Sequence, residues 1–170
     1  LKVRGGDLEV RMMDPEQMTG KNKQHLGRRL FATREIPRGA DGHFDPPLFL
    51  SGRLCVEKAV VERPTVCRIQ FVKFQGTSLG GLFLRLRRNC PVFFTCDSKG
   101  TGKSANAVIV EYMHGEHRPP HQLLELRLIR TLKAGDPILV NPSRAFLAYT
   151  HPDDPTRALP GDTPAEARTK

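Results

Sequence analysis

The sequence predicts a single domain built mainly of β-strands with short helices. Three observations favour this fold class. The chain has 170 residues, which is enough for one domain with a hydrophobic core. It contains 14 prolines and 15 glycines, which indicate many turns between short elements. Several stretches also alternate apolar and polar residues with the period of two that is typical of half-buried strands.

The N-terminal part of the chain is predicted to hold one strand between polar segments. Residues 1–25 show no clear hydrophobic period and form a flank outside the predicted domain. The segment RLFATREI (29–36) favours a strand that ends at the turn signal Pro37-Arg38-Gly39. The following GADGHFDPP (39–47) is rich in glycine and proline and is predicted as a loop.

The middle of the chain is predicted to continue with strands and one short helix. LFLSGRLCVEKAVV (48–61) favours a hairpin or a strand bent at Gly52. VCRIQFVKF (66–74) is predicted as a strand because it alternates and contains β-branched and aromatic residues. LGGLFLRLRR (79–88) favours a short helix, which its two glycines weaken.

The last third of the predicted domain holds four predicted strands. PVFFT (91–95) is predicted as a strand, followed by a polar loop (96–104) and a second strand in NAVIVEY (106–112). In LLELRLIRTL (123–132) leucines alternate with a glutamate and an arginine, which is the clearest half-buried strand of the chain. PILV (137–140) is predicted as a final short strand.

The charge of the chain is concentrated in its body. The formal net charge is +9, while the tail 151–170 holds three basic and four acidic residues, so residues 1–150 carry +10. The tail is rich in Asp, Pro, Thr and Ala, cannot bury a core and is predicted to be disordered. A basic body indicates acidic partners such as nucleic acid or a nucleosome surface, or an ordinary charge that keeps the domain soluble.

The cysteines and the apolar runs bear on metal binding, on the redox compartment and on membrane insertion. Cys55, Cys67, Cys90 and Cys96 form no C-x-x-C pair, so no metal site is predicted. Reduced and mostly buried thiols favour an intracellular protein. The longest apolar runs cover only a few residues, so the sequence predicts no membrane-spanning segment.

The stretch CDSKGTGKSANAVIV (96–110) looks like the phosphate loop of a nucleotide-binding protein. In the motif G-x-x-x-x-G-K-[ST], however, the first glycine would be Asp97, whose carboxylate repels phosphate. The motif must also open a helix, whereas the residues that follow favour a strand. We therefore expect a polar loop between two strands and no nucleotide site.

Several segments, in the same order, resemble the SET domain of protein-lysine methyltransferases. LGRRLFATREIPRG (26–39) is similar to the family's opening G-x-G-L-F-A-T-x-x-I-x-x-G, and PLFLSGRL to the strand and Gly turn that follow it. IQFVKFQGTSLGGLFLRLRRNCP resembles the region that leads into R-F-x-N-H-S-C-x-P-N. ELRLIRTLKAGDPILV resembles the late L-x-L-x-A-x-R-x-I-x-x-G-E-E-L. The similarity spans about residues 26–142, and we expect a SET-like domain over residues 26–150.

The resemblance implies a fold, a cofactor and a set of positions. SET domains consist of small curled sheets whose C-terminal segment threads beneath another loop in a pseudoknot. Their active members use S-adenosylmethionine to methylate lysine side chains of proteins such as histones. The positions that match the family's cofactor motifs in this chain are Gly27, Arg28, Arg29, Leu30, Arg87, Arg88, Asn89 and Asn106.

The chain departs from the family at these cofactor positions. In active members the second Gly of G-x-G lets the backbone approach the cofactor, but here that position is Arg29. Arg87-Arg88 replace the Asn-His pair that contacts the cofactor, and Asn89 replaces the Ser. The resemblance therefore implies vestigial cofactor positions.

The remaining departures concern the catalytic tyrosine and an insertion. Pro91 keeps its place, and the Asn of the family's P-N pair is best matched by Asn106, so residues 92–105 are expected to form an inserted surface loop, at least in part. The catalytic Tyr should follow ILV, where the chain has Asn141-Pro142. The two tyrosines of the chain match no family motif; they are Tyr112 and Tyr149.

LRRNCP also resembles a divergent SET subgroup with R-R-S-C in place of N-H-S-C, whose members act with a PHD finger in chromatin complexes. We therefore expect a nuclear SET-like module without methyltransferase activity or cofactor, which binds chromatin proteins or a histone tail in a transcription-regulating complex. A basic face would bind this partner, unless it is an ordinary solvated face; it consists of Arg28, Arg29, Arg85, Arg87 and Arg88. Two alternatives stay open: an active S-adenosylmethionine-dependent lysine methyltransferase, and a basic nucleic-acid-binding module.

Overall fold

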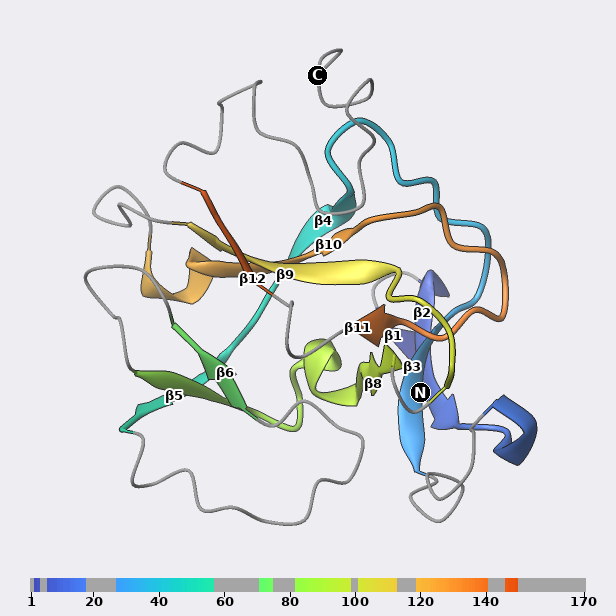
Figure 1. Cartoon of the computed structure of the whole chain (residues 1–170), viewed down its shortest axis with the longest axis horizontal. Coiled ribbons are helices and arrows are strands. Elements are labelled where there is room, and N and C mark those ends of the chain that lie inside the picture. Colours follow the sequence, from blue (N-terminus) through green and yellow to red (C-terminus); the bar gives the residue numbers. More distant parts are fainter. Residues whose placement is uncertain are drawn as a thin grey trace.

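The computed structural model describes residues 2–3, 6–17, 27–56, 71–74, 82–98, 101–112, 119–140 and 146–149. These residues form three β-sheets, and the helices among them are 3-10 turns of three or four residues. Figure 1 shows the longest strands across the middle of the molecule, a small sheet at the lower left and the N-terminal sheet at the right. The prediction of a mainly β fold is therefore confirmed. The predicted disorder of the tail 151–170 lies outside the described residues.

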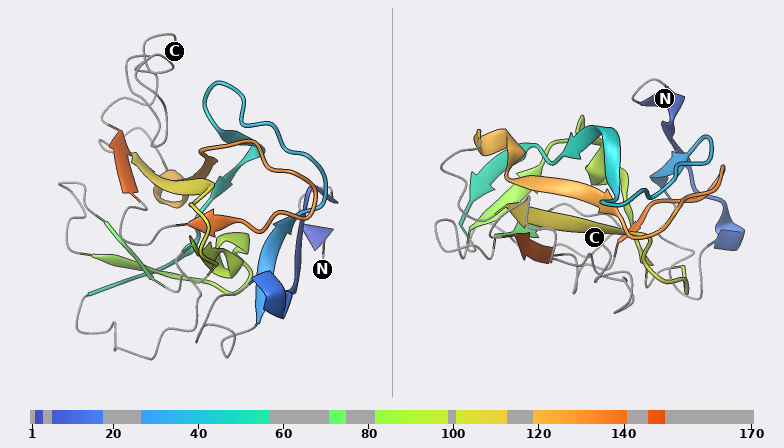
Figure 2. Two further views of the ribbon diagram at one scale, coloured as in Figure 1. Left: turned by 45° about the vertical axis from the view of Figure 1, so that its right-hand side comes forward. Right: turned by 90° about the horizontal axis from the view of Figure 1, so that it is seen from above.

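The N-terminal sheet joins the predicted flank to the predicted domain. It contains β1 (Lys2–Val3), β2 (Leu8–Met12) and β3 (Arg28–Ala32), in the order β1-β2-β3 with antiparallel pairing. Leu8 and Val10 of β2 are buried and belong to the same core cluster as Leu30 of β3. The polar flank 1–25 thus supplies a core strand, β2, which comes shortly before the η2 turn (Pro15–Gln17); both belong to the blue N-terminal part of the chain in Figure 2. Leu8, Val10 and Met12 alternate with Glu9 and Arg11, so this segment has the period of two that was not expected for residues 1–25.

The central sheet carries most of the predicted strands. Its order is β4-β10-β9-β11-β8, and β12 also pairs with β9. The bounds are β4 (His43–Phe49), β8 (Cys96–Asp97), β9 (Ala107–Tyr112), β10 (Leu124–Leu128), β11 (Leu139–Val140) and β12 (Phe146–Tyr149). The strands predicted in 106–112, 123–132 and 137–140 are therefore confirmed, and the η8 turn (Pro120–Gln122) precedes β10. The predicted loop over 39–47 is wrong from His43 onward, because strand β4 begins there and contains a cis Asp45–Pro46 bond. His43 is opposite Arg127 of β10, the register then shifts, and pairing continues with Leu48 opposite Leu126.

The C-terminal strands β11 and β12 run parallel to strands that lie much earlier in the sequence. β11 lies between β8 and β9 and is parallel to both, with Leu139 opposite Cys96 and Val140 opposite Ala107. β12 is parallel to β9 from Ile109 onward. The C-terminal segment therefore follows one edge of β9, while β10 occupies the other edge.

The third sheet contains a strand where the sequence predicted a helix. β5 (Gly52–Cys55), β7 (Phe83–Leu86) and β6 (Phe71–Lys73) pair antiparallel in the order β5-β7-β6. The helix predicted for 79–88 is wrong over Phe83–Leu86, because Leu84 and Leu86 alternate into the core with a period of two. The bend predicted at Gly52 lies where β5 approaches β7 so closely that a Cβ would overlap the Arg85 carbonyl oxygen.

A 3-10 turn stands where a strand was predicted in 91–95. The turn η5 (Pro91–Phe94) begins with a proline, and the Thr95 hydroxyl donates a hydrogen bond of 2.7 Å to the Val92 carbonyl. Val92 and Phe93 are both buried, and consecutive buried side chains suit a turn in the core better than the alternating faces of a strand. The inserted surface loop expected over 92–105 is therefore wrong for its first part, and its exposed residues in the described segment are Gly102–Ser104.

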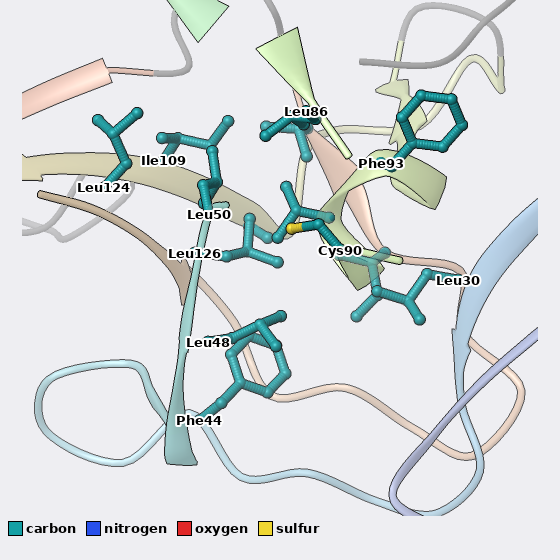
Figure 3. Packing of buried hydrophobic residues seen from close by; sticks show 14 of the residues in the cluster. Leu30, Phe44, Leu48, Leu50, Leu86, Cys90, Phe93, Ile109, Leu124 and Leu126 are labelled. Atoms are coloured by element: carbon teal, nitrogen blue, oxygen red, sulfur yellow. The ribbon is translucent and has the colours of Figure 1, made fainter. Parts of the chain in front are cut away.

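The main hydrophobic core lies between the three sheets. Its side chains come from β2, β3, β4, β6, β7, η5, β9, β10 and β11 and from residues next to them. Figure 3 shows Leu48 and Leu50 of the β4 region opposite Leu126 of β10, with Cys90 and Leu30 at the side of the N-terminal sheet. The core thus joins the two segments that carry the SET-like cofactor motifs.

Candidate functional site

The structure brings the two SET-like cofactor segments together. Strand β3 contacts the η5 turn, which directly follows the Arg87–Cys90 segment. Leu30 and Cys90 are both buried in the main core cluster and lie near each other in Figure 3. Gly27 is buried at the start of β3, where its carbonyl accepts a hydrogen bond of 3.1 Å from the Met13 backbone N–H. Segments about 60 residues apart in the sequence therefore meet in the fold.

Arg29 is buried completely, with an exposed fraction of 0%. Its Nη1 atom donates a hydrogen bond of 2.8 Å to the Arg28 carbonyl oxygen. Because alternate residues of a strand share a face, Arg29 lies on the same face of β3 as Phe31, which clusters with Cys96 and Leu139. Arg29 was expected on an exposed basic face, and this expectation is wrong because the guanidinium lies inside the protein.

The other arginines of the expected basic face are exposed. Arg28, Arg85, Arg87 and Arg88 all lie at the surface, as does Asn89. Within the described part of the chain no ion pair involves any of these four arginines. Their guanidinium groups are therefore in contact with solvent and available to an acidic partner.

Asn106 holds the C-terminal segment against the start of β9. Its side-chain oxygen accepts a hydrogen bond of 2.8 Å from the Leu139 N–H, and its side-chain nitrogen donates one of 2.9 Å to the Pro137 carbonyl. Its backbone adds bonds with the Leu139 carbonyl and the Ile129 N–H. Both polar atoms of the Asn106 side-chain amide therefore bond to the protein's own backbone, so the role of Asn106 in this fold is structural.

The position of the family's catalytic tyrosine, Asn141-Pro142, lies outside the described residues, and the side chain of Tyr149 is also outside them. Tyr112, at the end of β9, is described and is 4% exposed. Its hydroxyl donates a hydrogen bond to Glu125 Oε1 and accepts one of 2.6 Å from Arg127 Nη2. The phenol is therefore engaged in the core of the sheet.

Tyr112 belongs to a buried polar cluster that crosses three strands. Glu125 and Arg127 of β10 are 1% and 4% exposed, and Arg127 Nε lies 3.4 Å from Glu125 Oε1. His43 of β4 is opposite Arg127, and its Nδ1 atom lies 2.5 Å from Glu125 Oε2. The His43 side chain is 41% exposed, so it connects the buried carboxylate with solvent.

The cluster stabilises the ionised carboxyl and the neutral phenol. Burial alone raises the pKa of Glu125, but the hydrogen bonds from His43 and Tyr112 and the charge of Arg127 outweigh it and lower the pKa below 4.5. Burial first, and then the hydrogen bond to Glu125, raise the pKa of Tyr112 from 10.0 to about 12. At neutral pH the cluster therefore contains a carboxylate, a guanidinium and a protonated phenol, each with a partner.

The sequence predicted β10 but not this cluster. Leucines that alternate with charged residues indicate a strand with one face in water, yet all five residues of β10 are buried. The second face is buried as well, because Glu125 and Arg127 lie beside Val110 and Val108 of β9. These two valines are buried and form a cluster with Tyr112, Phe49 and Ile129. A sequence signal was present, because a glutamate and an arginine two residues apart on one strand face can neutralise each other when that face is covered.

The phosphate-loop interpretation fails on the structure as expected. Lys103 and Ser104 are exposed, and the element that follows is strand β9 rather than a helix. Within the described residues, no group of three or more potential metal ligands occurs. No helix in this part of the chain is long and apolar enough to cross a membrane.

The comparisons with known proteins leave the family open. No protein-family model matches the sequence, and no curated protein matches it at a significant level.

Proposed function

We propose that the chain is a SET-like module that binds a chromatin partner in a transcription-regulating complex in the nucleus and does not transfer methyl groups. The proposal rests on the resemblance of residues 26–142 to SET domains. It is supported by the contact between β3 and η5, which carry or adjoin the two cofactor motifs. The parallel position of β11 between β8 and β9 supports the C-terminal pseudoknot that the resemblance implies.

The proposed lack of methyl transfer rests on the burial of Arg29. The resemblance puts a glycine at this position, where the lack of a side chain lets the cofactor approach the backbone. Here a long side chain with no exposed surface lies on the Phe31 face of β3. A guanidinium is charged at all physiological pH values, so its burial beside protein groups makes the site both smaller and positively charged. S-adenosylmethionine is itself a cation at its sulfur, which adds repulsion to the loss of space.

The exposed arginines support the binding role. Arg28, Arg85, Arg87 and Arg88 make no ion pair with other described residues, so binding an acidic surface would not first require breaking one. Arginine recognises carboxylates and phosphates through paired hydrogen bonds, which fits histone-associated proteins and nucleosomal surfaces.

A methyl-transfer assay combined with a nucleosome-binding assay tests the proposal. Purified chain is incubated with radiolabelled S-adenosylmethionine and nucleosomes, and the same preparation is titrated onto nucleosomes in a gel-shift experiment. The proposal expects a gel shift and no label on any histone. Label on a histone lysine supports the active methyltransferase instead, and the absence of both label and gel shift rejects the chromatin role.

A further inference from the structure

We infer that the solvent-facing side of the β5-β7-β6 sheet binds single-stranded nucleic acid. This face carries Arg53, Lys73, Phe83 and Arg85, with Cys55 opposite Phe83, and Arg87 continues it. The inference rests on the proposed role as a binding module and names the chemistry of a partner. The face itself is independent of the cofactor positions on β3.

The register of the sheet places these side chains on one face. Arg53 of β5 is directly opposite Arg85 of β7, and Lys73 of β6 is directly opposite Phe83. Directly opposite residues of antiparallel strands point to the same side, as do residues two apart on one strand. Arg87 extends the row, because its N–H still bonds the Ser51 carbonyl at 3.1 Å.

The opposite side of the sheet accounts for the stability of these strands. Val72, Leu84 and Leu86 alternate with the basic residues and are buried in the main core. The strands therefore do not need the basic side chains for packing. Arg53, Lys73, Arg85 and Arg87 are all exposed.

The charges of this face are unfavourable for the isolated protein. Arg53 and Arg85 are like charges at directly opposite positions, an arrangement that destabilises a sheet. Among the described residues, no carboxylate forms an ion pair with either of them or with Lys73. The whole chain carries a net charge of +9, so a polyanion is the complementary ligand.

The aromatic side chain favours nucleic acid over an acidic peptide. Phe83 is only partly buried, and the Lys73 Nζ atom lies 5.8 Å from the centre of its ring. An aromatic ring between cations offers a base a surface for stacking while the cations contact the phosphates. An acidic peptide would use the cations but has no base to stack on the ring. In a strand, Arg85 and Arg87 are about 6.7 Å apart, which allows them to contact successive phosphates of an extended chain.

Fluorescence anisotropy with a labelled 20-nucleotide oligothymidylate tests the inference. If Arg53, Lys73, Arg85 and Arg87 each contact one phosphate, the salt slope is about −2.8, so a fourfold rise in salt weakens binding about 50-fold. Arg85→Glu should weaken binding strongly and reduce this slope. Arg130→Glu makes the same change in net charge at an exposed position after β10 and should have a much smaller effect.

Phe83→Leu separates stacking from charge. The substitution keeps an apolar side chain and should weaken binding at least about 5-fold while the salt slope stays unchanged. Melting temperatures of all variants are measured in parallel. Arg85→Glu should not lower the melting temperature, because it replaces a like-charge pair with an ion pair opposite Arg53.

Three results would overturn the inference. One is the absence of binding at low salt by the folded wild-type chain. The second is wild-type affinity in Arg85→Glu, which would place the ligand elsewhere. The third is a loss of the preference for single-stranded bases, which would remove the role of Phe83. It would appear as displacement of the oligonucleotide by polyglutamate of equal charge at equal or lower concentration, or as equal affinity for duplex DNA. Methyl transfer to histones would reject the proposed function but leave these binding results unaffected.

Discussion

Glu125 and Arg127 form an ion pair two residues apart on β10, and Glu9 and Arg11 form one with almost the same geometry on β2. The nitrogen–oxygen distances are 3.4 and 3.3 Å. The first pair is almost completely buried, whereas the second is exposed by 33% and 40%. The two pairs therefore differ in burial and in the further hydrogen bonds that His43 and Tyr112 make to the buried pair, so their comparison tests what the buried cluster contributes to stability.

Removal of one partner should have very different effects in the two pairs. Glu125→Ala leaves the Arg127 charge buried without its carboxylate and should lower the free energy of unfolding by about 3–5 kcal/mol. Glu9→Ala should lower it by less than about 1 kcal/mol, because solvent screens this pair. Urea denaturation of both variants measures the difference. Equal losses would show that the buried cluster does not depend on charge compensation.

The raised pKa of Tyr112 should appear as a loss of stability at alkaline pH. The phenol ionises near 10.0 in the unfolded chain and near 12 in the folded chain, so the unfolded state releases its proton first. The stabilisation is complete below pH 10 and is lost as pH rises to about 12, by roughly 2–3 kcal/mol.

Tyr112→Phe provides the control for this pH dependence. The variant should be less stable than the wild type at pH 8, because Glu125 and Arg127 each lose a hydrogen bond. Between pH 10 and pH 12 its stability should fall less steeply than that of the wild type. If the free energy of unfolding fell equally with pH in both proteins across this interval, ionisation of Tyr112 would not contribute to the alkaline loss of stability.

Asn106 should be more important for stability than an exposed asparagine in the other motif segment. Asn106→Ala removes two hydrogen bonds to the backbone of Pro137 and Leu139 and should cost about 2–3 kcal/mol. Asn89→Ala, at an exposed position, should change stability by less than about 0.5 kcal/mol. Amide hydrogen exchange of Leu139 provides a local measurement, since its N–H donates to Asn106 Oδ1. Unchanged protection in Asn106→Ala would contradict this role.

The neighbours Arg28 and Arg29 offer a second matched pair. Arg29→Ala removes a fully buried side chain and should destabilise the fold by about 2–4 kcal/mol through the cavity that it leaves. Arg28→Ala changes an exposed residue and should remain within about 0.5 kcal/mol of the wild type. Thermal unfolding followed by circular dichroism distinguishes the two. A similar small effect for both would mean that the Arg29 side chain does not fill space in the core.

A run of β-branched residues made β9 predictable, and the alternation of leucines with charged residues made β10 predictable. β9 and β10 follow from NAVIVEY and LLELRLIRTL, because β-branched and leucine side chains recur there over five or more residues. β7 was predicted as a helix because Phe83–Leu86 is too short for its period of two to stand out beside a long apolar segment. Phe83–Leu86 forms a strand because it pairs with β5 and β6. A local sequence pattern holds no information about such pairing.

The candidate sites were predictable only in part, for the same reason. The resemblance pointed to Arg29 as a substitution in a cofactor motif, but only the packing of β3 against the Cys96 and Leu139 cluster decides that its side chain is buried. The partners of Glu125 come from positions 82 and 13 residues away, in His43 and Tyr112. The basic face likewise depends on the register that brings Arg53 opposite Arg85.

We propose that a SET-like module holds Arg29 where active members admit their cofactor, and isothermal titration calorimetry with S-adenosylmethionine measures this. A folded wild-type chain should release or absorb no binding heat up to millimolar cofactor. Micromolar binding to the wild type, followed by transfer of the methyl group to a histone lysine, would contradict the account.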